Sequence, residues 1–234
     1  MLATLSTGAL AGPPYVTDDP VPTEFGHWEI YQYASGSGTE GATSGEAGVD
    51  LNYGGSERVQ LTLVVPVARQ DAAGDTHVGM GTVQLAAKYR VMRQDDGALM
   101  DIALFPRVFP PTAAEGLGSS DVAVLLPVWI GRASGDWYAF AGGGYQINPG
   151  RTNRDFWTGG AALTRALSEH LTMGAEVYGR TADADDARSY VGLNFGIAWS
   201  MSQHWSLLAS SGPGLVHAND EGRYAFYVAL QSVY

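Results

Sequence analysis

Side chains that could carry out catalysis or bind a metal are few in this sequence. It has five histidines and no cysteine, so thiolate chemistry and thiolate metal sites are excluded. Neither a Gly-x-Ser-x-Gly elbow nor a His-x-x-x-His pair occurs, the local patterns of serine hydrolases and zinc sites. We therefore predict no catalytic residue, no metal site and no cofactor. A membrane-embedded lipid hydrolase is the weaker alternative, with His77 or His217 in predicted outer loops.

The overall composition is unusual for a water-soluble protein. The chain has 234 residues, with 13 basic and 24 acidic side chains and a net charge of −11. Charged residues make up 16% of the chain, against roughly 25% in an ordinary soluble protein. A soluble surface of this size would be short of charge. An acidic chain with a single lysine also lacks the clustered bases that phosphate binding needs, so we expect no nucleic-acid partner.

Alternation with a period of two residues is the main structural signal. From Val59 to Val67 every second residue is Val or Leu, whereas Gln60 and Thr62 between them are polar. Twelve segments show this pattern, near residues 27–35, 45–53, 57–67, 82–91, 98–108, 119–130, 136–146, 155–166, 169–181, 187–200, 204–211 and 223–234. Three prolines fall inside these segments, where we expect a bulge or a strand end: Pro66, Pro106 and Pro127.

The connections between these segments alternate in length. Residues 54–56 and 168–170 belong to a short set, and residues 68–81 and 212–222 to a longer, more polar set. The sequence therefore predicts an all-β fold, an up-and-down antiparallel transmembrane β-barrel over residues 27–234. We expect twelve strands, short periplasmic turns and longer extracellular loops. Ten strands are the alternative, because the first two segments are rich in glycine and weakly patterned.

The two faces of the predicted strands differ in charge. The apolar face is nearly free of charged residues, and the polar face carries both signs. Because a small soluble barrel would not bury such charges, we assign the apolar face to lipid and the polar face to the lumen. Aromatic residues on the apolar face gather at strand ends, which is typical of membrane girdles. The predicted girdle residues are Trp28, Tyr53, Tyr89, Trp137, Tyr145, Phe156, Trp199, Trp205, Tyr224 and Tyr234.

The last predicted strand ends the chain on an aromatic residue. Tyr224, Phe226, Val228, Leu230 and Tyr234 share one parity. This pattern resembles the terminal signal by which outer-membrane assembly machinery recognises its substrates. We therefore expect the protein in the bacterial outer membrane, with outer-membrane lipid and the assembly machinery as partners.

The inward parity predicts what lines the lumen. The predicted lumen charges are Glu29, Asp50, Lys88, Arg90, Asp101, Arg107, Asp121, Arg165, Glu176 and Arg180. The predicted lumen aromatics are Tyr31, Tyr33, Phe105, Trp129, Tyr138, Phe140, Trp157, Tyr178, Tyr190 and Tyr227. These residues favour a narrow amphipathic channel, whose rings stack on an aromatic solute and whose charges tether polar groups. An occluded barrel with a purely structural polar core is the alternative.

Two segments precede the first predicted strand. Residues 1–11 are small and apolar and end in Ala-Leu-Ala, which is typical of the remnant of a secretory signal peptide. Residues 12–26 contain four prolines, which exclude a helix or a central strand. We predict that this periplasmic segment forms a partial plug in the lower lumen, with Asp18 and Asp19 near Arg90 or Arg165. A mobile tether is the alternative.

Four stretches carry a family resemblance: "GPPYVTDDPVPTEFGHWE" at 12–29, "VGMGTVQLAAKYRV" at 78–91, "YAFAGGGYQINPG" at 138–150 and "LTMGAEVYGRT" at 171–181. They resemble the outer-membrane transporter-like family labelled putative MetA-pathway of phenol degradation, over essentially the whole chain. The resemblance implies uptake of small, often aromatic, hydrophobic compounds, and it supplies no binding residues. We therefore expect a channel or transporter for passive uptake of small solutes, aromatic or hydrophobic ones included.

Overall fold

The computed structural model describes residues 14–234, and the regular structure in them is almost entirely β-strand. The predicted signal remnant at 1–11 lies outside the described residues. The strands are β1 (Trp28–Gly38), β2 (Ala42–Ser56), β3 (Val59–Ala72), β4 (Asp75–Met80), β5 (Gln84–Met92), β6 (Asp101–Leu104), β7 (Arg107–Phe109), β8 (Ala123–Ser134), β9 (Trp137–Ile147), β10 (Phe156–Ser168), β11 (Leu171–Arg180), β12 (Tyr190–Ser200), β13 (Trp205–Val216) and β14 (Tyr224–Val233). Two short helices, η1 (Gln94–Asp96) and α1 (Ala218–Glu221), lie in connections. Across residues 14–234, no helix is long and apolar enough to cross a membrane.

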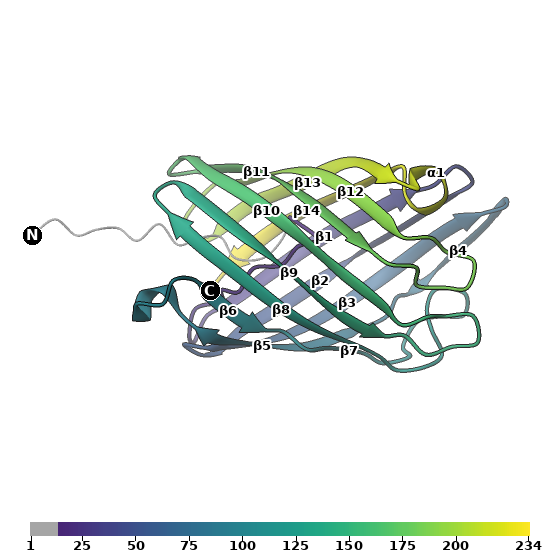
Figure 1. The fold of residues 1–234 in the computed structure, drawn as a ribbon, viewed down its shortest axis with the longest axis horizontal. Coiled ribbons are helices and arrows are strands. Elements are labelled where there is room, and N and C mark those ends of the chain that lie inside the picture. Colours follow the sequence, from purple (N-terminus) through teal and green to yellow (C-terminus); the bar gives the residue numbers. More distant parts are fainter. Residues whose placement is uncertain (1–13) are drawn as a thin grey trace, which may run out of the picture.

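The strands form one closed antiparallel barrel (Figure 1). β1 pairs with β2 on one side and with β14 on the other, which closes the sheet. β4 and β5 both pair with β3, and β6 and β7 both pair with β8, so each pair is one interrupted barrel strand. Fourteen segments therefore make a twelve-stranded barrel, and the predicted fold class and strand number are confirmed.

Prolines account for both interruptions. Pro106 lies between β6 and β7. The carbonyl of Pro66 accepts a hydrogen bond from Gly81 N at 2.9 Å, and the carbonyl of Pro127 accepts one from Phe105 N at 3.2 Å. In an antiparallel sheet the N–H and the C=O of one residue point toward the same neighbouring strand. The N–H that Pro66 and Pro127 lack would therefore point at the interruption in that strand. All three prolines thus sit at ladder irregularities, as expected.

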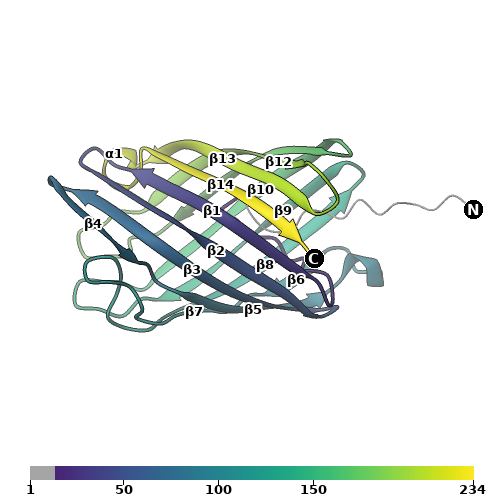
Figure 2. The ribbon, with the colours of Figure 1, turned by 180° about the vertical axis from the view of Figure 1, so that it is seen from behind.

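The two ends of the barrel differ. The chain's C-terminus and the short turns, such as 57–58, 135–136 and 169–170, lie at one end, and the connections 110–122, 148–155 and 181–189 lie at the other (Figure 1). One predicted loop is wrong: most of residues 68–81 continues β3 and forms β4, with Ala73 and Gly74 as a tight turn. Both turn residues have positive φ, which closes a two-residue hairpin. This hairpin reaches farther than the neighbouring strands (Figure 2).

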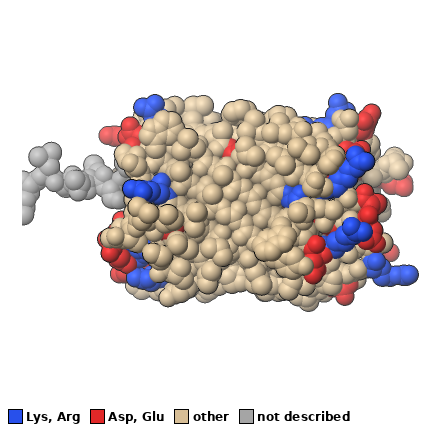
Figure 3. Space-filling view, viewed as in Figure 1, with Lys and Arg blue, Asp and Glu red and all other residues tan. Residues whose placement is uncertain are grey.

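Charged side chains gather at the two ends of the barrel, and the band between them is almost free of charge (Figure 3). Outward residues in this band are apolar, as with Val128, Leu163 and Val228, each at least 40% exposed. Aromatic pairs flank it: the rings of Trp28 and Tyr53 are 4.8 Å apart. An apolar belt between two charged rims is the surface that a bilayer requires, and it makes this an outer-membrane type of barrel.

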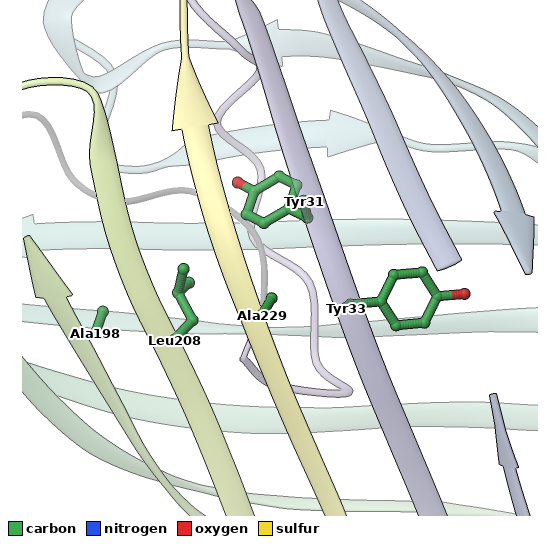
Figure 4. Close-up of a cluster of buried hydrophobic side chains, with 5 residues drawn as sticks. All are labelled: Tyr31, Tyr33, Ala198, Leu208 and Ala229. Atoms are coloured by element: carbon green, nitrogen blue, oxygen red, sulfur yellow. The ribbon is translucent and has the colours of Figure 1, made fainter. Parts of the chain in front are cut away.

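The buried side chains point into the barrel. One cluster comprises Tyr31 and Tyr33 on β1 with Ala198, Leu208 and Ala229 on β12, β13 and β14 (Figure 4). A second comprises Tyr138, Phe140 and Ala162, with Tyr15 and Val21 of the N-terminal stretch packed against it. The polar residues Lys88, Glu176 and Gln231 are equally buried. The interior is therefore a mixed aromatic and polar core.

The parity of the eighth barrel strand, β10, was predicted backwards. Trp157 is 61% exposed and lies outward, with its ring 5.2 Å from that of Tyr145. Arg165 shares the outward parity of Leu163, and its guanidinium lies 5.2 Å from the ring of Trp137. Phe156, predicted in the girdle, has the inward parity. At a strand end an arginine keeps its charge near water while its stem covers apolar surface, so its presence did not mark a lumen face.

One further predicted lumen charge is misplaced. Asp121 is exposed in the loop before β8, where its backbone N–H donates to the Ser119 hydroxyl at 3.1 Å. The predicted strand began at residue 119, whereas β8 begins at Ala123. Asp121 continues the inward parity beyond the strand, so it faces loop and solvent instead of the lumen.

Candidate functional site in the barrel lumen

The lumen holds a cavity of about 720 Å³. The strands β1, β2, β3, β5, β7 and β14 supply most of its wall, and residues 14–16 and 18 supply part of its lining. The predicted lumen residues that line it are Glu29, Tyr31, Tyr33, Asp50, Lys88, Phe105, Arg107 and Tyr227. The others with inward parity lie elsewhere along the lumen: Arg90, Asp101, Trp129, Tyr138, Phe140, Glu176, Arg180, Tyr178 and Tyr190. Charges and rings therefore share one internal space.

Residues 14–26, here called the N-terminal segment, run through this interior. Gly26 N donates to Gly54 O at 2.8 Å beside a bridge between Phe25 and Gly54, which holds the segment against the short-turn end of β2. Deeper inside, Thr23 N donates to the Gln60 side chain at 2.8 Å. At the far end, the Ser210 hydroxyl donates to the Pro14 carbonyl. The segment thus follows the inner wall from one end of the barrel into the lumen.

Glu176 on β11 anchors the middle of the N-terminal segment. Its carboxylate accepts the backbone N–H of Val16 at 2.9 Å and that of Thr17 at 2.8 Å. Asn194 donates to the same carboxylate at 2.9 Å. Glu176 is 1% exposed, so these N–H groups are what satisfies a buried charge. Its role was not predicted beyond its inward parity, because the donors are backbone groups of a distant segment.

Asp18 binds two bases of the opposite wall. Its carboxylate lies 3.0 Å from Lys88 Nζ and 2.6 Å from Arg107 Nη2. These two bases are not the predicted neighbours of Asp18: Arg90 pairs with Asp101, and Arg165 faces outward. Burial alone would raise the pKa of Asp18, but Lys88 and Arg107 outweigh burial and lower this pKa below its usual value. Asp19 is also buried, and its carboxylate accepts the N–H of Val21 at 2.7 Å.

Glycines on the inner wall make room for the N-terminal segment. A Cβ added at Gly131 would lie 2.9 Å from the ring of Pro20, and one at Gly196 would lie 2.7 Å from the ring of Tyr15. A Cβ at Gly160 would collide with the hydroxyl of Thr17. Glycine inside a strand often marks a close approach of another chain segment. These glycines occupy inward positions of β8, β10 and β12, which is the signal in the sequence that marks the close approach.

Filling one of these positions should displace the N-terminal segment. In Gly196→Leu the three atoms nearest to the new Cβ all belong to Tyr15, at 2.7 Å, and overpacking costs about 1–3 kcal/mol. Because the chain has no cysteine, a Thr17→Cys thiol gives a single reporter at a site that is 1% exposed. We expect Gly196→Leu to raise its rate of modification about tenfold, since ~1.4 kcal/mol is a factor of ten. The control is Gly192→Leu, whose Cβ meets Tyr178 and Tyr190 instead; an equal rise there would contradict the prediction.

One wall of the cavity combines acids with tyrosines. The Tyr31 hydroxyl donates to Glu29 at 2.7 Å, and the Tyr33 hydroxyl donates to Glu46 at 3.1 Å. The rings of Tyr33 and Tyr227 stack at 5.9 Å with 13° between their planes. Glu46 was missed because the glycine-rich start of β2 shows little alternation. This wall offers flat rings and hydrogen-bond acceptors to whatever enters the cavity.

The histidines considered for hydrolase chemistry lack triad geometry. His77 lies on β4, and His217 Nδ1 lies 2.6 Å from the backbone carbonyl of Ser189. Within residues 14–234, neither ring has a hydrogen bond to a serine hydroxyl or to a carboxylate. The arrangement therefore gives no support to a base held between a nucleophile and an acid.

Comparison with known proteins yields a family and a fold. The family model described as "Putative MetA-pathway of phenol degradation" matches residues 32–224. Among solved structures, an outer membrane channel from Pseudomonas putida F1 is similar with a TM-score of 0.77 and 14% identity, covering 96% of this chain and 100% of that chain. The NanC porin (TM-score 0.61, 10% identity, 88% of this chain and 99% of that chain) and the KdgM porin (0.56, 9%, 88% and 98%) share the fold. No curated protein matches the sequence.

Proposed function

The chain belongs to the family described as "Putative MetA-pathway of phenol degradation", and from this premise we propose that it is a channel for passive uptake of small solutes, aromatic or hydrophobic ones included. The observation that carries the proposal is the cavity of about 720 Å³, which is lined by rings and charges together. A cavity of this size suits a small organic molecule. The lipid-facing band places the two barrel mouths on opposite sides of the membrane.

The lining explains how such a solute would be held. Tyr33 and Tyr227 present stacked ring faces, and Glu29, Asp50 and Lys88 present ionisable groups on the same cavity. Rings bind an aromatic body without a fixed orientation, and polar groups then orient it. Passage needs no covalent chemistry, so the role is that of a channel and involves no catalysis.

The N-terminal segment acts in this proposal as a partial plug. It lies between the cavity and the short-turn end, and its anchors are hydrogen bonds and ion pairs that can break and reform. Passage then requires the segment to shift, and a solute entering from the loop end reaches the cavity first. The structural neighbours named as a channel or as porins support the channel role at the level of the fold and carry no information about the plug.

A swelling assay on liposomes bearing the folded barrel tests the transport role. Phenyl glucoside is a neutral aromatic that crosses lipid poorly and is larger than glucose. We expect it to enter faster than its size and the glucose rate together predict, because the cavity wall binds rings. Liposomes without protein give the background rate. If neither solute enters above that rate, the barrel is an occluded structural one and the transport role fails, while the fold is unaffected.

A further inference from the structure

Lys88, Phe105 and Arg107 form a compact group on the wall formed by β5 and β7. Lys88 Nζ lies 4.9 Å from the centre of the Phe105 ring, and the Arg107 guanidinium carbon lies 4.5 Å from it. Both cations also hold the Asp18 carboxylate, at 3.0 Å and 2.6 Å. One carboxylate thus sits between two cations beside an aromatic ring. This is the geometry that recognises an aromatic or apolar carboxylate.

The cations Lys88 and Arg107 need a negative counter-charge. The Lys88 side chain is 2% exposed and that of Arg107 18% exposed. Leaving a buried ammonium without a counter-charge is strongly unfavourable, whereas exchanging one carboxylate for another leaves the local charge unchanged. An anion that takes the place of Asp18 therefore lowers the free-energy cost of its departure.

We propose that Lys88, Phe105 and Arg107 are a binding subsite for the carboxylate of a small aromatic or apolar acid, with Asp18 as its internal occupant. The subsite deepens the proposed function by adding an acid to the solute classes, and it rests on that function only for the route of entry. Asp18, Lys88, Phe105 and Arg107 all line the cavity, so a solute there can reach them.

Equilibrium dialysis of the full chain, folded in detergent, tests the subsite with benzoate as the probe. Benzyl alcohol, which has the same ring without the charge, is the matched ligand. We expect Asp18→Asn to bind benzoate at least tenfold more tightly than the unmodified chain, because the internal competitor has lost its charge. Benzyl alcohol binding should change less than twofold. Asp18 lies outside the barrel strands, so the variant removes no strand pairing.

Matched variants separate the subsite from general charge effects. Asp71→Asn removes an acid that pairs with Arg69 at 2.7 Å outside this group, and it should leave benzoate binding unchanged. Lys88→Gln or Arg107→Gln, each combined with Asp18→Asn, should abolish the gain. The proposal is overturned if Asp18→Asn fails to tighten benzoate binding, or tightens benzyl alcohol binding equally. If phenyl glucoside enters but Asp18→Asn does not tighten benzoate binding, the subsite is wrong and the channel stands. If benzoate binding tightens but phenyl glucoside does not enter, the channel is wrong and the subsite stands.

Discussion

Replacing Glu176 by alanine should release the N-terminal segment from the lumen wall. The carboxylate accepts the N–H groups of Val16 and Thr17, and a hydrogen bond to a charged group contributes about 1.5–3 kcal/mol. Losing both costs about 3 kcal/mol or more, so the population of the displaced segment should rise ~100-fold. Thiol modification of Thr17→Cys measures this population, because the Thr17 hydroxyl is buried and has no hydrogen-bond partner among residues 14–234.

The control for this result is a second acid of the same lumen. Glu46 lines the cavity and accepts a hydrogen bond from the Tyr33 hydroxyl, and within residues 14–234 its carboxylate has no hydrogen bond to the N-terminal segment. Glu46→Ala should therefore leave the modification rate of Thr17→Cys within about twofold of its starting value. Equal rates in Glu176→Ala and Glu46→Ala would mean that the anchor lies elsewhere, and the role of the segment as a plug would lose its main support.

The barrel could be predicted from the sequence because its determinants are local. Alternation is a property of each strand, and the contrast between short turns and long connections follows from chain order. The tight turn at Ala73 and Gly74 shows the limit of this reasoning: a polar stretch that continues a strand beyond the membrane looks like a loop. The sequence predicts irregularities in the sheet at Pro66 and Pro127. It does not predict which neighbouring strand is interrupted, because that depends on the direction in which each proline carbonyl points.

The contacts of the N-terminal segment could not be predicted, because they depend on how far it reaches along the lumen. Asp18 was expected near Arg90 and instead pairs with Lys88, two residues away on the same face of β5. That difference is about 7 Å at 3.3 Å per residue, well within the reach of an extended segment. Its second partner, Arg107, lies on a different strand. The position of the N-terminal segment along β5 and β7 therefore determines that Asp18 pairs with Lys88 and Arg107.

The assignment of inward and outward faces is the step from which every statement about the lumen follows. It succeeded where the apolar parity was continuous and failed on β10, where Trp157 and Arg165 suggested the wrong face. Strands rich in glycine and alanine carry little information about their faces. Charge placed on a single outward position therefore gives the most direct test of the orientation.

Val228→Arg should be strongly destabilising. Val228 lies outward, midway along β14 and opposite Ala34 and Ala209, in the band that faces lipid. Arginine at the centre of a bilayer costs about 2–4 kcal/mol, and about 0–1 kcal/mol near the interfaces. Val78 on the β3–β4 hairpin is also exposed and lies at the loop end, so Val78→Arg is the matched control. Urea unfolding of the vesicle-inserted barrel should show a large loss of unfolding free energy only for Val228→Arg. Equal losses would contradict the lipid-facing band, because only Val228 lies within it.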